Sequence, residues 1–172
     1  MTIETALLIV PPQEVQAFAA PLRERYAPLS FAQGPAHVTL FYPFVPPPDL
    51  PAAVERLASL CATIPSIEIT LNQYGRFPKA VYLEPHEPAS ILRLHRILLE
   101  AFPEYPPYQG AFGTALVPHL TLAHDIEDTA DVPLPPAPSF TFTVERLHLY
   151  AGDPQVRAAW VALAVFPLGP RR

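Results

Sequence analysis

Two tetrapeptides of this chain combine a histidine with a threonine two positions later, His-Val-Thr-Leu at 37–40 and His-Leu-Thr-Leu at 119–122. Residues two apart on a β-strand point to the same face, so each segment presents an imidazole beside a hydroxyl. Two such segments facing each other would surround one small anion. One histidine could then take a proton while the other gives one, and the hydroxyls could hold phosphate oxygens.

A single copy of this pattern is typical of a half-buried strand with a surface histidine. Two copies that agree at every defining position, including the final leucine, favour a functional site. We therefore predict four catalytic residues: His37, Thr39, His119 and Thr121.

The same order of elements precedes both motifs. Before and through the first motif, the pattern predicts a strand at 5–10, a helix opened by Pro11-Pro12 and running to about residue 26, a loop through 34–35, and a strand at 37–41. Before and through the second, it predicts a strand at 80–84, a helix at 89–102, a long loop, and a strand at 119–122. This order indicates an internal duplication of architecture.

The remaining patterns complete one α+β domain spanning residues 1–172. They predict a helix at 49–61, a one-sided strand at 67–71, a loop at 75–79, and strands at 140–144, 147–150 and 160–166. We expect a bilobal molecule with pseudo-two-fold duplicated antiparallel sheets, helices packed on the outside, and a central groove holding both motifs.

Composition limits the classes of protein that fit. Half of the 172 residues are hydrophobic, so a packed core is expected. A formal charge of −5 disfavours a general nucleic-acid binder, and we expect no extended duplex as partner. The single cysteine, Cys61, excludes an intrachain disulfide and reads as a core residue. With no signal-peptide pattern and no apolar run of membrane-spanning length, we predict a monomeric cytoplasmic protein without membrane contact.

Several further side chains are candidates for substrate binding. Tyr42 follows the first motif and could stack on a base, with core packing as the alternative. The loop at 75–79 offers Arg76, Phe77 and Lys79 as contacts to a phosphate or base, although an exposed hairpin loop with chance charges is the simpler explanation. Tyr150 belongs to a strand that could line the groove or form an ordinary sheet face.

The other histidines read as structural or exposed. His86 falls in a turn, His95 on the surface of a helix, and His148 on a strand whose role stays open. His124 is five residues past His119, an odd separation that would turn it to the opposite face of a continuing strand. We therefore predict neither a metal site nor a cofactor.

The two motifs resemble those of the 2H phosphoesterase superfamily, which includes the bacterial 2′-5′ RNA ligase-like proteins and cyclic nucleotide phosphodiesterases. Members carry two His-x-Thr/Ser-x motifs, and residues 37–40 and 119–122 match them; the segment 140–168 is similar to the closing segment of the family. The resemblance implies a bilobal fold, a water-filled groove, no metal requirement, and chemistry at ribose-linked phosphodiesters. The Pro-rich stretch at 132–138 stands where family members often carry a further helix.

The expected function is metal-independent hydrolysis of 2′,3′-cyclic phosphates or 2′-5′ linkages in nucleotides or RNA ends. The same four residues could also catalyse the reaction in the opposite direction, joining a hydroxyl to a cyclic phosphate, and the protein would then be a 2′-5′ RNA ligase. The sequence decides neither the direction of the reaction nor which histidine is the acid. Two further alternatives are a non-catalytic nucleotide or RNA-end binding module and a metal-dependent phosphohydrolase. The acid–base pair speaks against the first, and the lack of a carboxylate–histidine cluster against the second.

Overall fold

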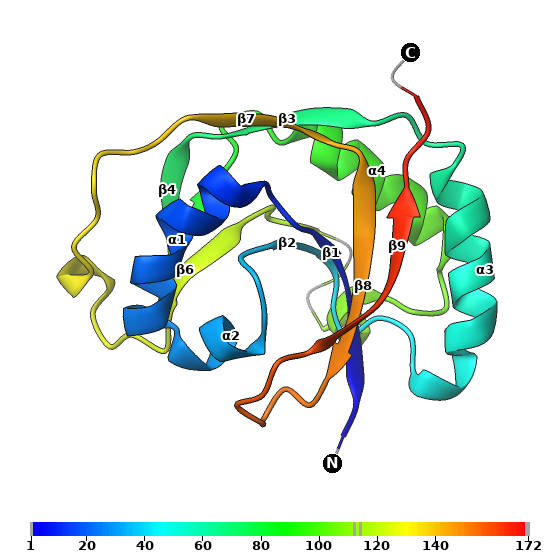
Figure 1. Ribbon diagram of the computed structural model, residues 1–172, viewed down its shortest axis with the longest axis horizontal. Coiled ribbons are helices and arrows are strands. Elements are labelled where there is room, and N and C mark those ends of the chain that lie inside the picture. The colour runs from blue at the N-terminus through cyan, green and yellow to red at the C-terminus, as the bar shows by residue number, and fades with distance from the viewer. Residues whose placement is uncertain (1, 112, 114, 171–172) are drawn as a thin grey trace.

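The computed structural model describes residues 2–111, 113 and 115–170 and shows an α+β fold (Figure 1). The α-helices are α1 (Gln13–Tyr26), α2 (Pro28–Gln33), α3 (Leu50–Cys61) and α4 (Ala89–Ala101), and short 3-10 helices are η1 (Pro47–Asp49), η2 (Pro107–Gly110) and η3 (Thr129–Asp131). The strands are β1 (Glu4–Ile9), β2 (Val38–Phe41), β3 (Ile67–Leu71), β4 (Gln73–Phe77), β5 (Ala80–Glu84), β6 (Leu120–His124), β7 (Phe140–Val144), β8 (Arg146–Gly152) and β9 (Val161–Pro167).

Seven of these strands form one antiparallel sheet in the order β4-β5-β6-β2-β1-β8-β9. The two strands that continue the histidine motifs, β2 and β6, are neighbours in its middle. The other two strands, β3 and β7, pair separately over five residues and lie along the top of the molecule in Figure 1. Both motifs therefore meet on one continuous sheet. The duplication of the two halves stays a prediction.

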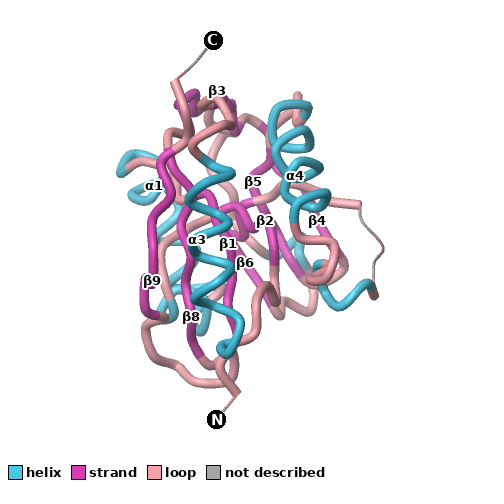
Figure 2. The backbone as a smooth tube through the Cα atoms, turned by 90° about the vertical axis from the view of Figure 1, so that its right-hand side faces the viewer, coloured by secondary structure: helices cyan, strands magenta, loops and turns pink. Residues whose placement is uncertain are grey.

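The helices α1, α3 and α4 cover one face of the large sheet and leave its opposite face uncovered. Their apolar stripes share a single core with alternate residues of the central strands; fully buried members include Val15, Leu57, Leu94, Leu98, Leu7, Val38, Leu40, Leu120 and Leu122. Figure 2, seen from the side of α3 and α4, shows these two helices in front of the strands. Because strand residues alternate between faces, the residues between these core positions point to the uncovered face.

Most helices and strands predicted from the sequence begin and end within one or two residues of their observed bounds, and two predictions were wrong. Residues 75–79 are not a loop: β4 runs through Phe77 and only Pro78-Lys79 form the turn to β5. The segment 28–33, predicted as part of a loop, is the helix α2. A helix this short has no full apolar stripe, so its periodicity could not be detected.

The prediction that His95 lies on the helix surface was also wrong. His95 is only 4% exposed and packs against the ring of Phe41, with 5.2 Å between ring centroids. It lies one residue after Leu94 on the buried stripe of α4, and burial lowers its pKa. Histidine is amphipathic enough to occupy such a position when its neighbours are aromatic.

Two smaller expectations concern the core and the membrane. Cys61 is buried at the end of α3 as predicted, and burial raises the pKa of its thiol to about 11. Among the helices that the structure describes, none has the length and apolar character needed to cross a membrane.

Candidate active site

The pairing of β2 with β6 brings the two motifs side by side. Val38 pairs with Leu120 in an antiparallel register. Partners in an antiparallel ladder move in opposite directions along the two strands, so His37 falls opposite Thr121, and Thr39 opposite His119. All four side chains leave the sheet on the face that the helices do not cover, because Val38 and Leu120 point into the core.

Both histidines are held in the same way by the backbone. Nδ1 of His37 lies 2.8 Å from the carbonyl oxygen of Pro35, and Nδ1 of His119 lies 2.7 Å from that of Val117. A carbonyl only accepts, so each Nδ1 carries the proton when the ring is neutral, and each Nε2 then holds a free lone pair. Both rings thus present Nε2 as the group that can take or give a proton.

The two threonines are free to bind a ligand. Thr39 and Thr121 are half-buried, and neither hydroxyl has a hydrogen-bond partner among the described residues. A hydroxyl can donate one hydrogen bond to a phosphate oxygen at each position. Two imidazoles and two unpaired hydroxyls therefore form a centre suited to one tetrahedral anion.

Polar side chains of α1 brace the segment before His37. Gln16 makes two hydrogen bonds of 2.8 Å to the backbone of Ala36, one in each direction. Arg23 is 3% exposed and donates to the carbonyl oxygens of Ser30, at 2.9 Å, and Gly34, at 3.0 Å. The approach to the first motif is therefore fixed by α1 through residues 30–36.

Aromatic rings support His119 instead. The ring of His119 lies 5.2 Å from that of Phe77 and 5.1 Å from that of Tyr82, between centroids. Gly75 makes room for this arrangement, because a Cβ atom there would lie 2.1 Å from the Tyr82 ring. The orientation of His119 thus depends on a ring packed over a residue that has no side chain.

The electrostatic surroundings of the two histidines differ. Burial lowers the pKa of His37 to about 4, and the nearby charge of Arg23 acts in the same direction, against the hydrogen bond to Pro35. Burial also lowers the pKa of His119, but its hydrogen bond to Val117 and the carboxylate of Glu84 oppose that shift. The neutral form is favoured most strongly at His37.

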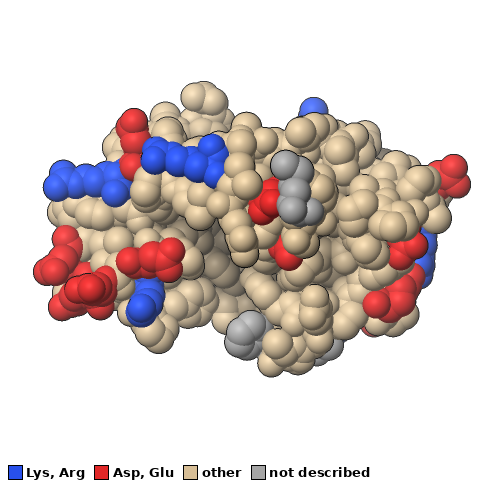
Figure 3. All heavy atoms as spheres, turned by 90° about the horizontal axis from the view of Figure 1, so that it is seen from below, with Lys and Arg blue, Asp and Glu red and all other residues tan. Residues whose placement is uncertain are grey.

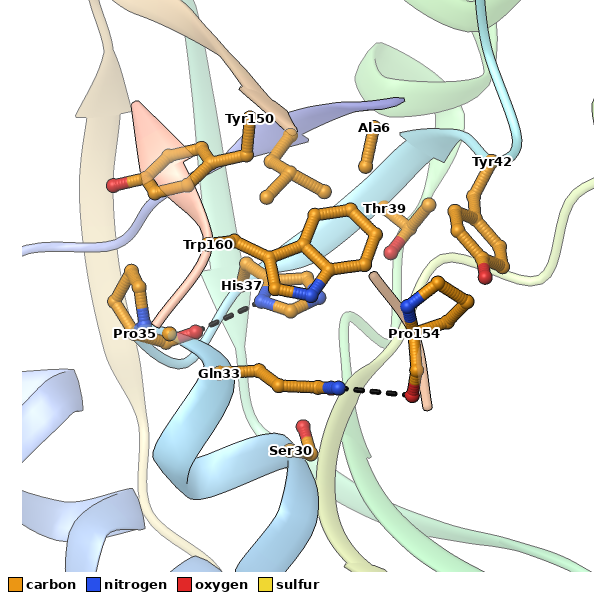
Figure 4. A pocket seen from close by; sticks show the side chains of 12 residues that line it. Ala6, Ser30, Gln33, Pro35, His37, Thr39, Tyr42, Tyr150, Pro154 and Trp160 are labelled. Carbon is orange, nitrogen blue, oxygen red and sulfur yellow. Dashed lines mark hydrogen bonds between the residues drawn. The ribbon is translucent and has the colours of Figure 1, made fainter. Parts of the chain in front are cut away.

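A hollow of about 240 Å³ opens beside His37 and Thr39. Its lining includes the aromatic side chains of Tyr42, Tyr150 and Trp160, which come from three different parts of the chain (Figure 4). Tyr42 donates a hydrogen bond to the Glu4 carboxylate, and burial is the main cause that raises its pKa. Both tyrosines predicted to bind substrate thus lie beside the first motif.

A second hollow lies on the Thr121 side and contains His124, against the prediction that His124 faces away. The pairing of β5 with β6 shifts register, so that Tyr82 is opposite Thr121 but Val81 is opposite Ala123. This bulge adds one residue and returns His124 to the face of Thr121. His124 is exposed and lies 3.1 Å from the carboxylate of Asp125.

The two hollows share Ser30, Gln33 and Pro154 and are therefore parts of one groove. Figure 3 views the molecule from below Figure 1 and shows a hollow in the middle of this face. Most of the lysine and arginine side chains visible in that view lie to its left, the side on which Figure 1 places α1 and β6.

Not every predicted binding residue reaches this groove. Phe77 touches His119, but Arg76 pairs with core-facing Val81 and so leaves the strand on the opposite face. Lys79 is exposed in the β4–β5 turn. The structure therefore separates the aromatic candidate of this hairpin from Arg76.

Three further side chains, Phe44, His86 and His148, lie outside this groove. Phe44 is buried in the core, and His86 is exposed with Nδ1 3.2 Å from Gln73. His148 lines a separate hollow with Val10 and Arg146. In the described part of the chain, no group of three or more His, Cys, Asp or Glu side chains is placed to hold a metal ion.

Trp160 and Gln33 line this groove, although neither was predicted from the sequence to bind substrate. Trp160 lies at the end of a loop far along the chain, and Gln33 lies on the unpredicted helix α2. The only available signal was that Trp160 is the sole tryptophan of the chain.

Known proteins are similar to this chain in sequence and in fold. A family model described as the 2′-5′ RNA ligase superfamily matches residues 11–155. The protein GK0864 of Geobacillus kaustophilus, named as a phosphoesterase, is 31% identical over 154 residues, which cover 83% of this chain and 84% of that protein.

Two solved structures show the same fold. TT0787 of Thermus thermophilus superposes with a TM-score of 0.72 at 20% identity, over 98% of this chain and all of that one. LigT of E. coli in complex with 3′-AMP gives a TM-score of 0.70 at 21% identity, over 98% and 99% of the two chains. On the sequence matches, this chain belongs to the 2′-5′ RNA ligase superfamily, the 2H phosphoesterases.

Proposed function

We propose that this protein hydrolyses phosphodiesters of ribose, either 2′,3′-cyclic phosphates or 2′-5′ linkages of nucleotides or RNA ends, without a metal ion. One observation carries the proposal: two imidazoles present free Nε2 atoms on the same sheet face, each opposite an unpaired threonine hydroxyl. This is a complete set of proton acceptor, proton donor and oxyanion ligands for one phosphate.

For a 2′,3′-cyclic phosphate, the reaction adds one water across one P–O bond of the ring. The histidine that acts as base takes a proton from a water molecule while the oxygen of that water attacks phosphorus. The acid histidine gives a proton to the ribose oxygen that leaves. Thr39 and Thr121 donate to the non-bridging oxygens, whose negative charge the site must hold. A nucleoside monophosphate results, and the proton moves on balance from one imidazole to the other.

The surroundings of the histidines favour His37 as base and His119 as acid. His37 is the ring held neutral most strongly, by burial and by the Arg23 cation. His119 is the ring beside a carboxylate, which stabilises an imidazolium. The negative charge of a phosphodiester bound between the rings would favour protonation of both, so the difference between their surroundings supports this division of roles.

Ligation, in which the hydroxyl of an acceptor attacks the cyclic phosphate in place of water and the same ring P–O bond breaks, uses the same groups and is the second candidate. A simple screen separates them. The protein in buffer with chelator is incubated with 2′,3′-cyclic nucleotides, with 2′-5′-linked dinucleotides, and with cyclic-phosphate RNA ends plus a 5′-hydroxyl acceptor.

We expect hydrolysis of at least one of the first two in the presence of chelator. Joined RNA without hydrolysis would favour the ligase. An inactive protein that divalent metal restores would overturn the two-histidine mechanism, and nucleotide binding without any turnover would favour a binding module.

A further inference from the structure

A buried arginine lies behind one wall of the groove. Arg23, on α1, is 3% exposed and is the one buried lysine or arginine among the residues that the structure describes. Its Nη2 donates to the carbonyl oxygens of Ser30, at 2.9 Å, and of Gly34, at 3.0 Å. Both of these residues line the hollow beside His37, whereas Arg23 lines neither hollow. The guanidinium is therefore separated from the groove by the layer of residues to which it is bonded.

The positive charge of Arg23 has no carboxylate to balance it. In the described part of the chain, its side chain contacts two carbonyl oxygens, the Ser30 hydroxyl and the ring of Phe31, and all of these partners are neutral. Burial lowers the pKa of Arg23 to about 10, which still leaves it protonated at neutral pH. A buried charge is costly unless an opposite charge lies near it. An anion bound in the groove would supply that opposite charge.

The hydroxyl of Ser30 connects this charge to the groove. Nη2 of Arg23 donates to Ser30 Oγ at 3.2 Å, so the hydroxyl accepts that bond and its own hydrogen stays available. Among the described residues, none accepts a hydrogen bond from this hydroxyl. Ser30 lines both hollows, and Figure 4 shows its oxygen pointing from α2 toward the side of Gln33 and His37. A hydroxyl that accepts a bond from a cation is polarised and becomes a stronger donor.

A structural role explains only part of this arrangement. The two carbonyl bonds of Arg23 brace the segment before His37, but they need a donor and not a charge. The ion pairs that Arg56 and Arg146 make with glutamates lie at the surface, where every side chain is at least 43% exposed and solvent screens the charge. Arg23 is shielded from solvent, so its field reaches the groove with less screening.

We propose that Ser30 is a further ligand of the substrate, whose Oγ donates a hydrogen bond to a charged oxygen of the phosphodiester, and that Arg23 is the positioning residue that holds and polarises this hydroxyl. The inference rests on the proposed function and deepens it, because Ser30 adds a third hydroxyl donor to Thr39 and Thr121. The threonines bind the anion from the sheet, and Ser30 binds it from α2 at the junction of the two hollows.

The first test removes the hydroxyl and measures anion binding by calorimetry. In the full chain, Ser30→Ala should weaken the binding of inorganic phosphate and of adenosine 3′-monophosphate by about 10-fold, as expected for a lost hydrogen bond to a charged group. The variant keeps both carbonyl acceptors of Arg23, so the segment stays braced. Ser59→Ala, at an exposed position of α3, is the matched control and should bind like the wild type. Unchanged phosphate affinity in Ser30→Ala would overturn the proposal.

The second test separates the charge of Arg23 from its role as a brace. Arg23→Met removes the charge and should weaken phosphate binding, whereas Arg23→Lys keeps the charge and should restore most of the affinity. The melting temperature reports the brace and should fall in both variants, because neither side chain makes the same set of hydrogen bonds. Arg96→Met, at an exposed position of α4, is the control for loss of one positive charge. A phosphate affinity that follows the melting temperature and not the charge would overturn the role of Arg23.

Turnover separates this proposal from the one on which it rests. If the function is right and the role of Ser30 is wrong, the wild type and Ser30→Ala hydrolyse 2′,3′-cyclic phosphates with the same kcat and KM. If the function is wrong and the role of Ser30 as an anion ligand is right, the wild type hydrolyses no ribose phosphodiester, while Ser30→Ala still binds inorganic phosphate about 10-fold more weakly than the wild type.

Discussion

The two histidine motifs have nearly the same sequence and the same backbone hydrogen bond, yet they lie in different surroundings. His37 is approached by a segment that Gln16 and Arg23 fix from α1, and an aromatic hollow opens beside it. His119 is packed against Phe77 and Tyr82 and lies near Glu84. The repeated motif thus supplies equivalent atoms, and we propose that the surroundings, which are not repeated, give the two histidines different roles.

The two histidines have different surroundings because different strands lie beside β2 and β6 in the sheet. On one side of the β2–β6 pair, β1 and β8 carry Ala6 and Tyr150, which leave space for a ligand. On the other side, β5 and β4 bring Tyr82 and Phe77 onto the histidine. We proposed that His37, beside the hollow, is the general base and that His119, packed against aromatic rings, is the general acid. Experiments that change one histidine or its surroundings at a time test this division.

The largest effect is expected from removal of either imidazole. His37→Ala and His119→Ala should each lower kcat by about 10²- to 10⁴-fold, the usual contribution of a general acid or base. A substrate with a 4-nitrophenolate leaving group needs no acid, so it should restore turnover in His119→Ala but not in His37→Ala.

His86→Ala is the matched control, because His86 is exposed and lies outside the two hollows. Restoration in His37→Ala instead would reverse the assignment of roles. Equal behaviour of both variants with both substrates would show that the surroundings do not divide the chemistry.

A smaller loss is expected from the threonines, where the two halves should behave alike. Thr39→Val and Thr121→Val keep the shape of the side chain and remove a donor to the phosphate. Each should lower kcat by about 10²-fold, the lower end for a lost oxyanion ligand. Serine at either position should restore most of the rate. A valine variant with wild-type kcat would show that its hydroxyl does not touch the reacting phosphate.

Stability should depend on pH through His37. Its pKa of about 4 in the folded protein lies below the value of 6.5 in the unfolded chain. As pH falls, the unfolded state therefore binds a proton first, and folding free energy is lost from about pH 6.5 down to about pH 4. At about 1.4 kcal/mol per pH unit, the difference between 6.5 and about 4 corresponds to about 3.4 kcal/mol, which is an upper limit because solvent screens the half-buried ring.

This dependence is measured by urea unfolding of the wild type and of His37→Asn between pH 7.5 and 4.5. The variant should lose less stability over that range, because its side chain does not titrate. Parallel curves would mean that His37 ionises as it does in water. His95 is common to both proteins, so its own contribution cancels in the comparison.

The placement of each motif's histidine and threonine on one face of a strand could be predicted from the sequence, because the signal for it is local. Alternation within each four-residue motif places the histidine and the threonine on one face, and no distant contact is needed to see it. The strands and longer helices were predicted for the same reason. Each carries its own period of apolar residues.

What the sequence missed depends on register and on contacts between distant segments. His124 reaches the groove only because a bulge in β6 breaks the alternation that placed it on the other face. Trp160 meets Gln33 across more than 120 residues, and Gln33 lies on a helix too short to show a period. His95 resembled a surface residue beside Arg93 and Arg96, whereas its burial is decided by the Phe41 ring of another element.

The smallest and most selective effect is expected from removing the negative charge of Glu84, which lies near His119. In kcat/KM, the low-pH limb should report His37, near pH 4, and the high-pH limb His119, below pH 6.5. Glu84 favours the imidazolium form of His119, so Glu84→Gln should move the high-pH limb to lower pH and leave the low-pH limb in place. Glu87→Gln, at an exposed neighbouring position, should move neither limb. A shift of the low-pH limb in Glu84→Gln would place the acid and the base the other way round, because the carboxylate would then be acting on the residue that must be neutral.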